Sequence, residues 1–139
     1  EGVYAMHYFY YDLDSFADKE IARNAKAFTE LYRGKYKRPP DAYATIAYIA
    51  YTEMFRGFEA AKSLDPQKVS AAMMANGGKF TTVKGPARWR EDHAAEYQHA
   101  AFLVKGKGPR EQKHEWDLFT VMGSVGGETV MPTLKSLGY

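Results

Sequence analysis

"PPDAYATIAYIAYTEMFRGFEAAKSLDPQKVSAAM", residues 39–73, contains a helix stop and two helix starts. The two prolines at its beginning end any helix that precedes them. Asp41 is placed to cap a long helix over 41–62. Asp65 and the proline after it start a shorter helix over 66–76, because proline is favoured at the first helical position. The stretch therefore predicts two consecutive helices that follow an earlier element.

The long helix has an unusual surface, with tyrosines set among alanines. Its polar residues Thr45, Thr52, Arg56 and Glu59 fall on one side, and most other positions are apolar or small. Such a helix is covered by neighbours over most of its circumference. Left uncovered, its apolar face would exceed the few hundred Å² that a soluble monomer usually exposes. That face is formed by Tyr43, Ile46, Ala47, Ile49, Ala50, Phe55 and Phe58.

A third helix is predicted before the prolines, over 17–37. Asp14 or Ser15 is expected to cap it, and basic residues gather near its end, where they suit the helix dipole. Its apolar residues recur every three or four positions, as on one face of an amphipathic helix. These residues are Ile21, Ala25, Phe28, Tyr32 and Tyr36.

Short apolar runs bounded by turn residues predict strands on both sides of the helices. Gly85 and Pro86 are expected to form a turn, and the glycine-rich end of the chain from Gly123 is expected to be a weakly ordered tail. The order of strand, three helices and further strands indicates an α/β or α+β arrangement. The predicted strands cover 3–10, 80–83, 97–104 and 116–122.

Composition narrows the function classes. The 139 residues suffice for one domain, and 26% of them are charged, with a formal net charge of only +2. This balance argues against nucleic-acid binding, which normally requires a basic face. There is no cysteine, so disulfides, thiolate metal sites and a cysteine nucleophile are excluded. The sequence shows neither an apolar run of membrane-spanning length nor a secretion signal. It begins with Glu1 rather than Met, which predicts a processed, trimmed or partial chain.

Candidate catalytic and metal-binding patterns are weak. His93 follows two acidic residues, but its spacing to His99 and His114 matches no compact metal motif, so we interpret it as part of a polar turn. The glycine run at 123–127 lacks the strand and the Lys-Ser/Thr pair of a phosphate-binding loop. We therefore expect no enzyme activity, no cofactor and no metal. The tyrosines at 43–51 are compatible with either a core or a ligand platform.

Several segments together resemble the branched-chain amino-acid type of periplasmic solute-binding protein, which serves ATP-driven importers. The matching segments are the aromatic positions before the prolines, the tyrosine-rich helix, "AAKSLDPQKV", "FTTVKGP", "DHAAEYQHAAFLVKGKG" and the opening "EGVY". The resemblance runs over nearly the whole chain and lies in the C-terminal portion of the family's sequence pattern.

The resemblance implies an α/β fold: the C-terminal part of a two-lobed type I periplasmic binding protein fold, with three helices followed by short strands. It implies that residues 1–27 end the second lobe, that 28–96 return to the first lobe, and that 97–139 form closing strands of the second lobe and a tail. The tyrosine-rich helix would then pack on a sheet encoded elsewhere. The expected partner is an upstream N-terminal segment of the same protein or another copy of the chain.

The resemblance also implies a function. The chain is expected to bind a small-molecule ligand (an amino acid, amide or aromatic acid) in an interlobe cleft, in the periplasm or outside the cell, and to deliver it to the membrane permease of an ABC importer. Glu1 is expected to hold a ligand ammonium, with Tyr4, Tyr8 and Tyr43 near the cleft wall. The alternative is a ligand-sensing domain of a receptor or transcriptional regulator with the same fold.

Overall fold

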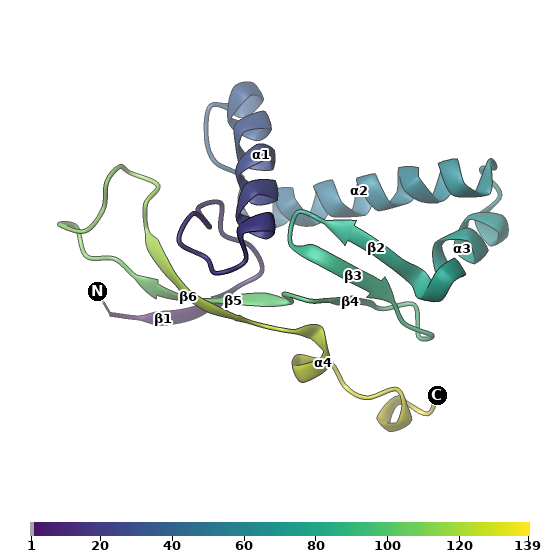
Figure 1. Ribbon diagram of the computed structural model, residues 1–139. Coiled ribbons are helices and arrows are strands. Elements are labelled where there is room, and N and C mark those ends of the chain that lie inside the picture. Colours follow the sequence, from purple (N-terminus) through teal and green to yellow (C-terminus); the bar gives the residue numbers. More distant parts are fainter. Residues whose placement is uncertain (1) are drawn as a thin grey trace.

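The computed structural model describes residues 2–139 as a mixed α/β structure with two small sheets and three long helices (Figure 1). This confirms the expected fold class and the three helices, whose ends agree with prediction to within two residues. The elements are β1 (Tyr4–His7), α1 (Lys19–Tyr36), α2 (Ala42–Ala61), α3 (Pro66–Met74), a 3-10 turn (Ala75–Gly78), β2 (Lys79–Thr82), β3 (Gly85–Trp89), β4 (Ala95–Tyr97), β5 (Ala101–Gly106), β6 (Phe119–Val125), α4 (Gly127–Val130) and a 3-10 turn (Lys135–Leu137).

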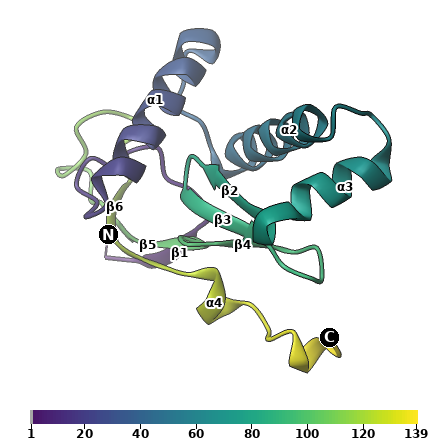
Figure 2. The same cartoon turned by 45° about the vertical axis from the view of Figure 1, so that its right-hand side comes forward.

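Both sheets are antiparallel and each has three strands. Sheet A has the order β1-β5-β6, and sheet B has the order β2-β3-β4. Helix α1 stands over the sheet A side of the molecule, whereas α2 and α3 lie along one side of sheet B (Figures 1 and 2). The chain passes from sheet B to sheet A through Gln98–Ala100, the crossover segment.

The main core lies between α1 and sheet A. Helix α1 is capped by Asp18, whose carboxylate accepts hydrogen bonds from the amides of Glu20 and Ile21. The expected cap at Asp14 or Ser15 is wrong. The segment between β1 and α1 stays non-helical through Phe16, whose side chain is buried in the core, and the helix begins only after Asp18. The buried cluster consists of Phe9, Tyr10, Tyr11, Leu13, Phe16, Ile21, Ala22, Ala25, Phe28, Phe102 and Val104.

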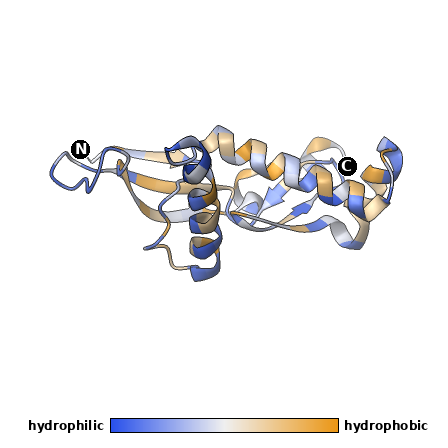
Figure 3. Cartoon of the chain, turned by 90° about the horizontal axis from the view of Figure 1, so that it is seen from above, coloured by the Kyte–Doolittle hydropathy of each residue, from blue (hydrophilic) through white to orange (hydrophobic). Residues whose placement is uncertain are grey.

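Helix α2 buries a narrow stripe and exposes a broad apolar face. The buried residues Thr45, Ile49, Glu53 and Gly57 are spaced four apart, and Gly57 allows α3 to approach closely. Glu53 pairs with Arg56 and accepts a hydrogen bond from the indole of Trp89, so its buried carboxylate is compensated. Apolar residues recur along the α2 ribbon in Figure 3. The large exposed ones are Tyr43, Ile46, Tyr48, Tyr51 and Phe55.

Sheet A also has an uncovered apolar face. In β1 and β5, alternate residues point toward the core, and Phe102 and Val104 are fully buried. Tyr4, Met6 and Leu103 lie on the opposite side and are exposed. Since antiparallel sheets commonly place polar residues on a solvated face, this face has the composition of one that packs against another layer.

The hairpin between β2 and β3 differs from the expected Gly-Pro turn. The turn consists of Val83 and Lys84, and Gly85 already belongs to β3 with φ of 93°. The Thr82 hydroxyl accepts a hydrogen bond from the Lys84 amide and donates one to the Gly85 carbonyl. The turn therefore lies two positions earlier than predicted, and the Thr82 hydroxyl closes it.

The later strands also differ from expectation. The strand predicted over 97–104 is divided by the crossover segment, because the chain changes sheets there. The strand predicted over 116–122 begins at Phe119, since the buried Asp117 carboxylate binds Lys107 and the Lys113 amide and holds the preceding loop. The expected weakly ordered tail is wrong in part: β6 continues to Val125, and a short helix follows.

Removing a side chain from the α1–sheet A core is expected to be costly. Phe102→Ala should lower the free energy of unfolding by about 3–5 kcal/mol, because it leaves a cavity among aromatic neighbours. Leu103→Ala is the matched control, on the opposite face of the same strand, and should cost at most about 1 kcal/mol. Urea unfolding followed by circular dichroism measures both. Equal losses would contradict the assignment of the core face.

Candidate functional site

The residues expected to contact ligand lie in different places. Glu1 lies outside the described residues. Tyr4 is on the exposed face of β1, and Tyr43 is in the first turn of α2 with 82% of its surface exposed. Tyr8 follows β1 and is half-buried against Tyr97 and Lys84. The aromatic contacts found in residues 2–139 join Tyr8 to neither Tyr4 nor Tyr43.

Tyr8 belongs to a cluster at the junction of the two sheets. The Lys84 ammonium nitrogen lies 3.3 Å from the centre of the Tyr8 ring and 4.7 Å from that of Tyr97. It also donates a hydrogen bond of 2.7 Å to the Ala100 carbonyl. The two tyrosine rings meet edge to face at 6.0 Å. Segments after β1, between β2 and β3, and between β4 and β5 thus converge on one nitrogen.

Burial controls the protonation of this cluster. Lys84 is completely buried, and burial lowers its pKa to about 7 because desolvation penalises the charged form. Burial raises the pKa of Tyr8 well above its usual value, so its hydroxyl stays neutral. None of the ion pairs found in the described part of the chain includes Lys84.

His99 lies beside the crossover on the sheet A side. Its ring stacks on Phe102, its Nδ1 lies 2.6 Å from the Ser124 hydroxyl, and burial lowers its pKa. Its Nε2 is buried without a hydrogen-bond partner. Sequence reasoning missed both Lys84 and His99 as parts of one cluster. Lys84 adjoins the predicted Gly-Pro turn, but only the chain crossing brings it beneath Tyr8.

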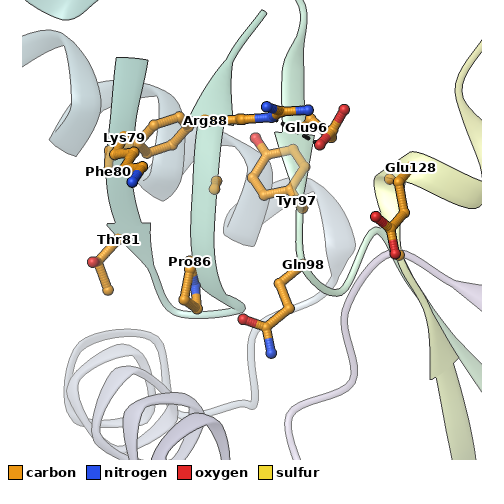
Figure 4. A pocket seen from close by; sticks show the side chains of 12 residues that line it. Lys79, Phe80, Thr81, Pro86, Arg88, Glu96, Tyr97, Gln98 and Glu128 are labelled. Carbon is orange, nitrogen blue, oxygen red and sulfur yellow. Dashed lines mark hydrogen bonds and ion pairs between the residues drawn. The ribbon is translucent and has the colours of Figure 1, made fainter. Parts of the chain in front are cut away.

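A hollow of about 560 Å³ lies on the other face of sheet B (Figure 4). Lys79, Arg88 and Glu96 form a row across its three strands, and Arg88 pairs with Glu96 at 2.9 Å. Glu128, from the segment after β6, stands at the edge of the hollow (Figure 4). A row of charged residues opposite an apolar face is typical of a solvated antiparallel sheet, so we do not assign ligand binding to this hollow.

Metal ligands are not assembled in the part of the chain that the structure describes. Residues 2–139 contain no group of three or more histidine or acidic side chains placed to hold an ion. His93 lies in a turn with φ of 61°, and its amide donates to the Arg90 carbonyl. The neighbouring Asp92 carboxylate forms an ion pair with the Arg90 guanidinium.

Among the helices of residues 2–139, none combines the length and apolar character needed to span a bilayer.

Known structures share this fold. A periplasmic binding protein from Burkholderia mallei superposes with a TM-score of 0.76 at 22% identity, over 97% of this chain and 33% of its own. A branched-chain amino acid ABC transporter periplasmic ligand-binding protein from Burkholderia xenovorans LB400 gives 0.81 at 24%, over 98% and 33%. A solute-binding protein of an ABC transporter from R. palustris, solved in complex with benzoate, gives 0.66 at 22%, over 91% and 31%.

The chain spans about a third of the length of these structures. No curated protein matches it by sequence. A family model described as periplasmic binding protein matches residues 1–111, which includes β1, all three long helices and sheet B, and it confirms the resemblance seen in the sequence. On this match the chain belongs to the periplasmic binding protein family.

Proposed function

We propose that the chain is the C-terminal part of the substrate-binding component of an ABC-type importer. The family match over residues 1–111 carries this proposal. The family is one of solute-binding proteins rather than enzymes, and its role is to bind a small molecule and present it to a membrane permease. A location in the periplasm or outside the cell follows from the same proposal.

The two sheets support a division between two lobes. The strands of sheet A come from within 1–27 and 97–139, which we assign to the second lobe. Helices α2 and α3 with strands β2 and β3 lie within 28–96, which we assign to the first lobe. Helix α1 crosses the first of these boundaries and packs in the core of sheet A. A chain that passes between lobes more than once suits a protein that closes by hinge motion.

The proposed ligand is an amino acid, an amide or an aromatic acid. The exposed Tyr43 and Tyr4 offer rings with a hydroxyl at one end, which suit a ligand that is part apolar and part polar. The R. palustris relative was solved with benzoate, an aromatic acid. Glu1 is proposed to hold a ligand ammonium through charge-assisted hydrogen bonds.

The two uncovered apolar faces support a partner layer. One is the outer face of α2, and the other is the outer face of sheet A; both expose large apolar side chains. We propose that a segment encoded upstream of residue 1 covers these faces except at Tyr4 and Tyr43, which face the ligand, and that a second copy of the chain takes its place when that segment is absent. Burying these faces supplies the hydrophobic free energy for the association.

Self-association of the 139-residue chain should therefore depend on α2. Tyr51 is 60% exposed and lies opposite the buried stripe of the helix, so Tyr51→Glu places a charge in the proposed contact. We expect sedimentation velocity to show oligomers for the parent chain and a shift toward monomer for this variant. Thr52→Glu, the same change about a quarter-turn away, should leave the oligomers in place. A parent chain that sediments as a stable monomer would contradict the uncovered-face proposal.

Ligand binding is expected to need both the upstream segment and Tyr43. Calorimetric titration of amino acids and aromatic acids should detect binding only when the upstream segment is present. Tyr43→Ala should weaken it about tenfold or more, a loss on the order of 1.4 kcal/mol. Tyr36→Ala, an exposed tyrosine at the end of α1, is the control and should have little effect. Equal losses for both variants would remove Tyr43 from the site.

A further inference from the structure

Lys84 is a buried cation that the proposed function does not explain. It is completely buried in the turn between β2 and β3. Taking an ammonium group out of water is costly, so buried lysines are usually paired with a carboxylate. The ion pairs of residues 2–139 do not include it. Its nitrogen is instead held by groups that carry partial negative charge.

Each of its three contacts comes from a different segment. Tyr8 lies where the chain leaves β1, Tyr97 ends β4, and Ala100 lies in the crossover segment. The Ala100 carbonyl accepts the hydrogen bond at 2.7 Å, and the tyrosine rings lie at 3.3 Å and 4.7 Å. The negative face of an aromatic ring attracts a cation. The nitrogen therefore joins both sides of the junction between the sheets.

The turn that carries Lys84 is itself fixed in place. A Cβ at Gly85 would lie 2.7 Å from the Cδ1 atom of Ile21, so the turn touches α1 directly. Val83, the other turn residue, packs against the α1–sheet A core. The tip of the sheet B hairpin is thus inserted into the other half of the molecule, and Lys84 lies at that tip.

We propose that Lys84 is a positioning residue, whose side-chain nitrogen holds the Tyr8 ring and the crossover segment in a fixed relation to the β2–β3 turn. Its effect on ligand binding rests on the proposed function, because Tyr8 is one of the proposed ligand contacts. Its effect on the junction does not, and can be measured without ligand.

The titratable groups around the ammonium are Tyr8, Tyr97, His99 and the N-cap Asp18, which acts on His99 from the start of α1. Burial raises the pKa of Tyr8 and lowers that of His99, so both stay neutral as pH rises above 7. Burial also lowers the pKa of Lys84 from 10.5 to about 7. Lys84 therefore loses its charge just above neutral pH, while Tyr8 and His99 stay neutral.

The sign of the stability effect follows from this difference. Between pH 7 and 10.5 the unfolded chain holds a proton on Lys84 that the folded chain has lost. Stability should rise with pH across this window, and the Lys84 contribution should be flat below it. The unfolding equilibrium constant should fall by up to about tenfold per pH unit within the window.

The first test uses the unaltered chain, with ¹³C-labelled lysine and NMR between pH 5 and 11. One lysine signal should titrate near pH 7, and the ring signals of Tyr8 and Tyr97 should shift with the same midpoint. Lys84→Met should remove that lysine signal and so assign it. If the ring signals of Tyr8 and Tyr97 do not follow the titration of the Lys84 signal, the proposal is overturned.

The second test measures amide hydrogen exchange at Gln98 and Ala100, whose amides donate to the carbonyls of Pro86 and Val125. Lys84→Met should raise the exchange rates of both amides by about tenfold or more, which corresponds to local opening of the crossover segment. The same variant should abolish the rise in the free energy of unfolding above pH 7. Lys79→Met, at an exposed lysine of the same hairpin, is the control and should change neither. Unchanged exchange in Lys84→Met would overturn the proposal.

A ligand titration of Lys84→Met, made with the upstream segment present, separates the two claims. Faster exchange together with weaker binding supports both the positioning role and the placement of Tyr8 in the site. Faster exchange with unchanged affinity supports the positioning role and removes Tyr8 from the site. Absence of binding in the unaltered protein would contradict the proposed function and leave the exchange result standing.

Discussion

The constraint on which the structure depends is that α2 exposes a broad apolar face that this chain does not cover, although its inner stripe is already buried. The inner stripe is satisfied: Thr45 and Ile49 are buried, and the Glu53 carboxylate is compensated by Arg56 and Trp89. The outer side presents tyrosine, isoleucine and phenylalanine to solvent. Because burying apolar area is the main source of folding free energy, such a helix is stable in water only when a second layer lies on it.

Sheet A has the same requirement, because its outer face exposes the large apolar side chains of Tyr4, Met6 and Leu103. Each sheet has only three strands, so its stability depends on packing one hydrophobic face against another element. Helix α1 covers one side of sheet A, and helices α2 and α3 cover one side of sheet B. Between them the chain changes direction at the crossover segment, where the buried Lys84 contacts residues from both halves. The two halves thus meet at the β2–β3 turn, through the polar contacts of Lys84 and the apolar contacts of Val83.

Much of this was predictable from local sequence. The helix boundaries followed from Asp41, Asp65 and the proline pair, because caps and proline act within a few residues. The division of the predicted strand at the crossover segment was not predictable, since the alternation of apolar residues does not reveal a change of sheet. The position of the hairpin turn was not predictable either. The Thr82 hydroxyl decided the turn, and the buried Asp117 decided where the last strand begins. The role of Lys84 was also not predictable from the sequence, because only tertiary packing brings its side chain beneath the Tyr8 ring.

The central claim is that the outer face of α2 packs on a layer supplied by a segment upstream of residue 1. The absence of cysteine makes it directly testable, since Tyr51→Cys introduces a single thiol on that face. With the chain alone, diluted until its oligomers dissociate, the thiol should react with a maleimide reagent as fast as an exposed cysteine. Adding the upstream segment should slow the reaction by about a hundredfold, as for a site that opens rarely, while Thr52→Cys stays reactive. An unchanged rate at position 51 in the presence of the upstream segment would contradict the account.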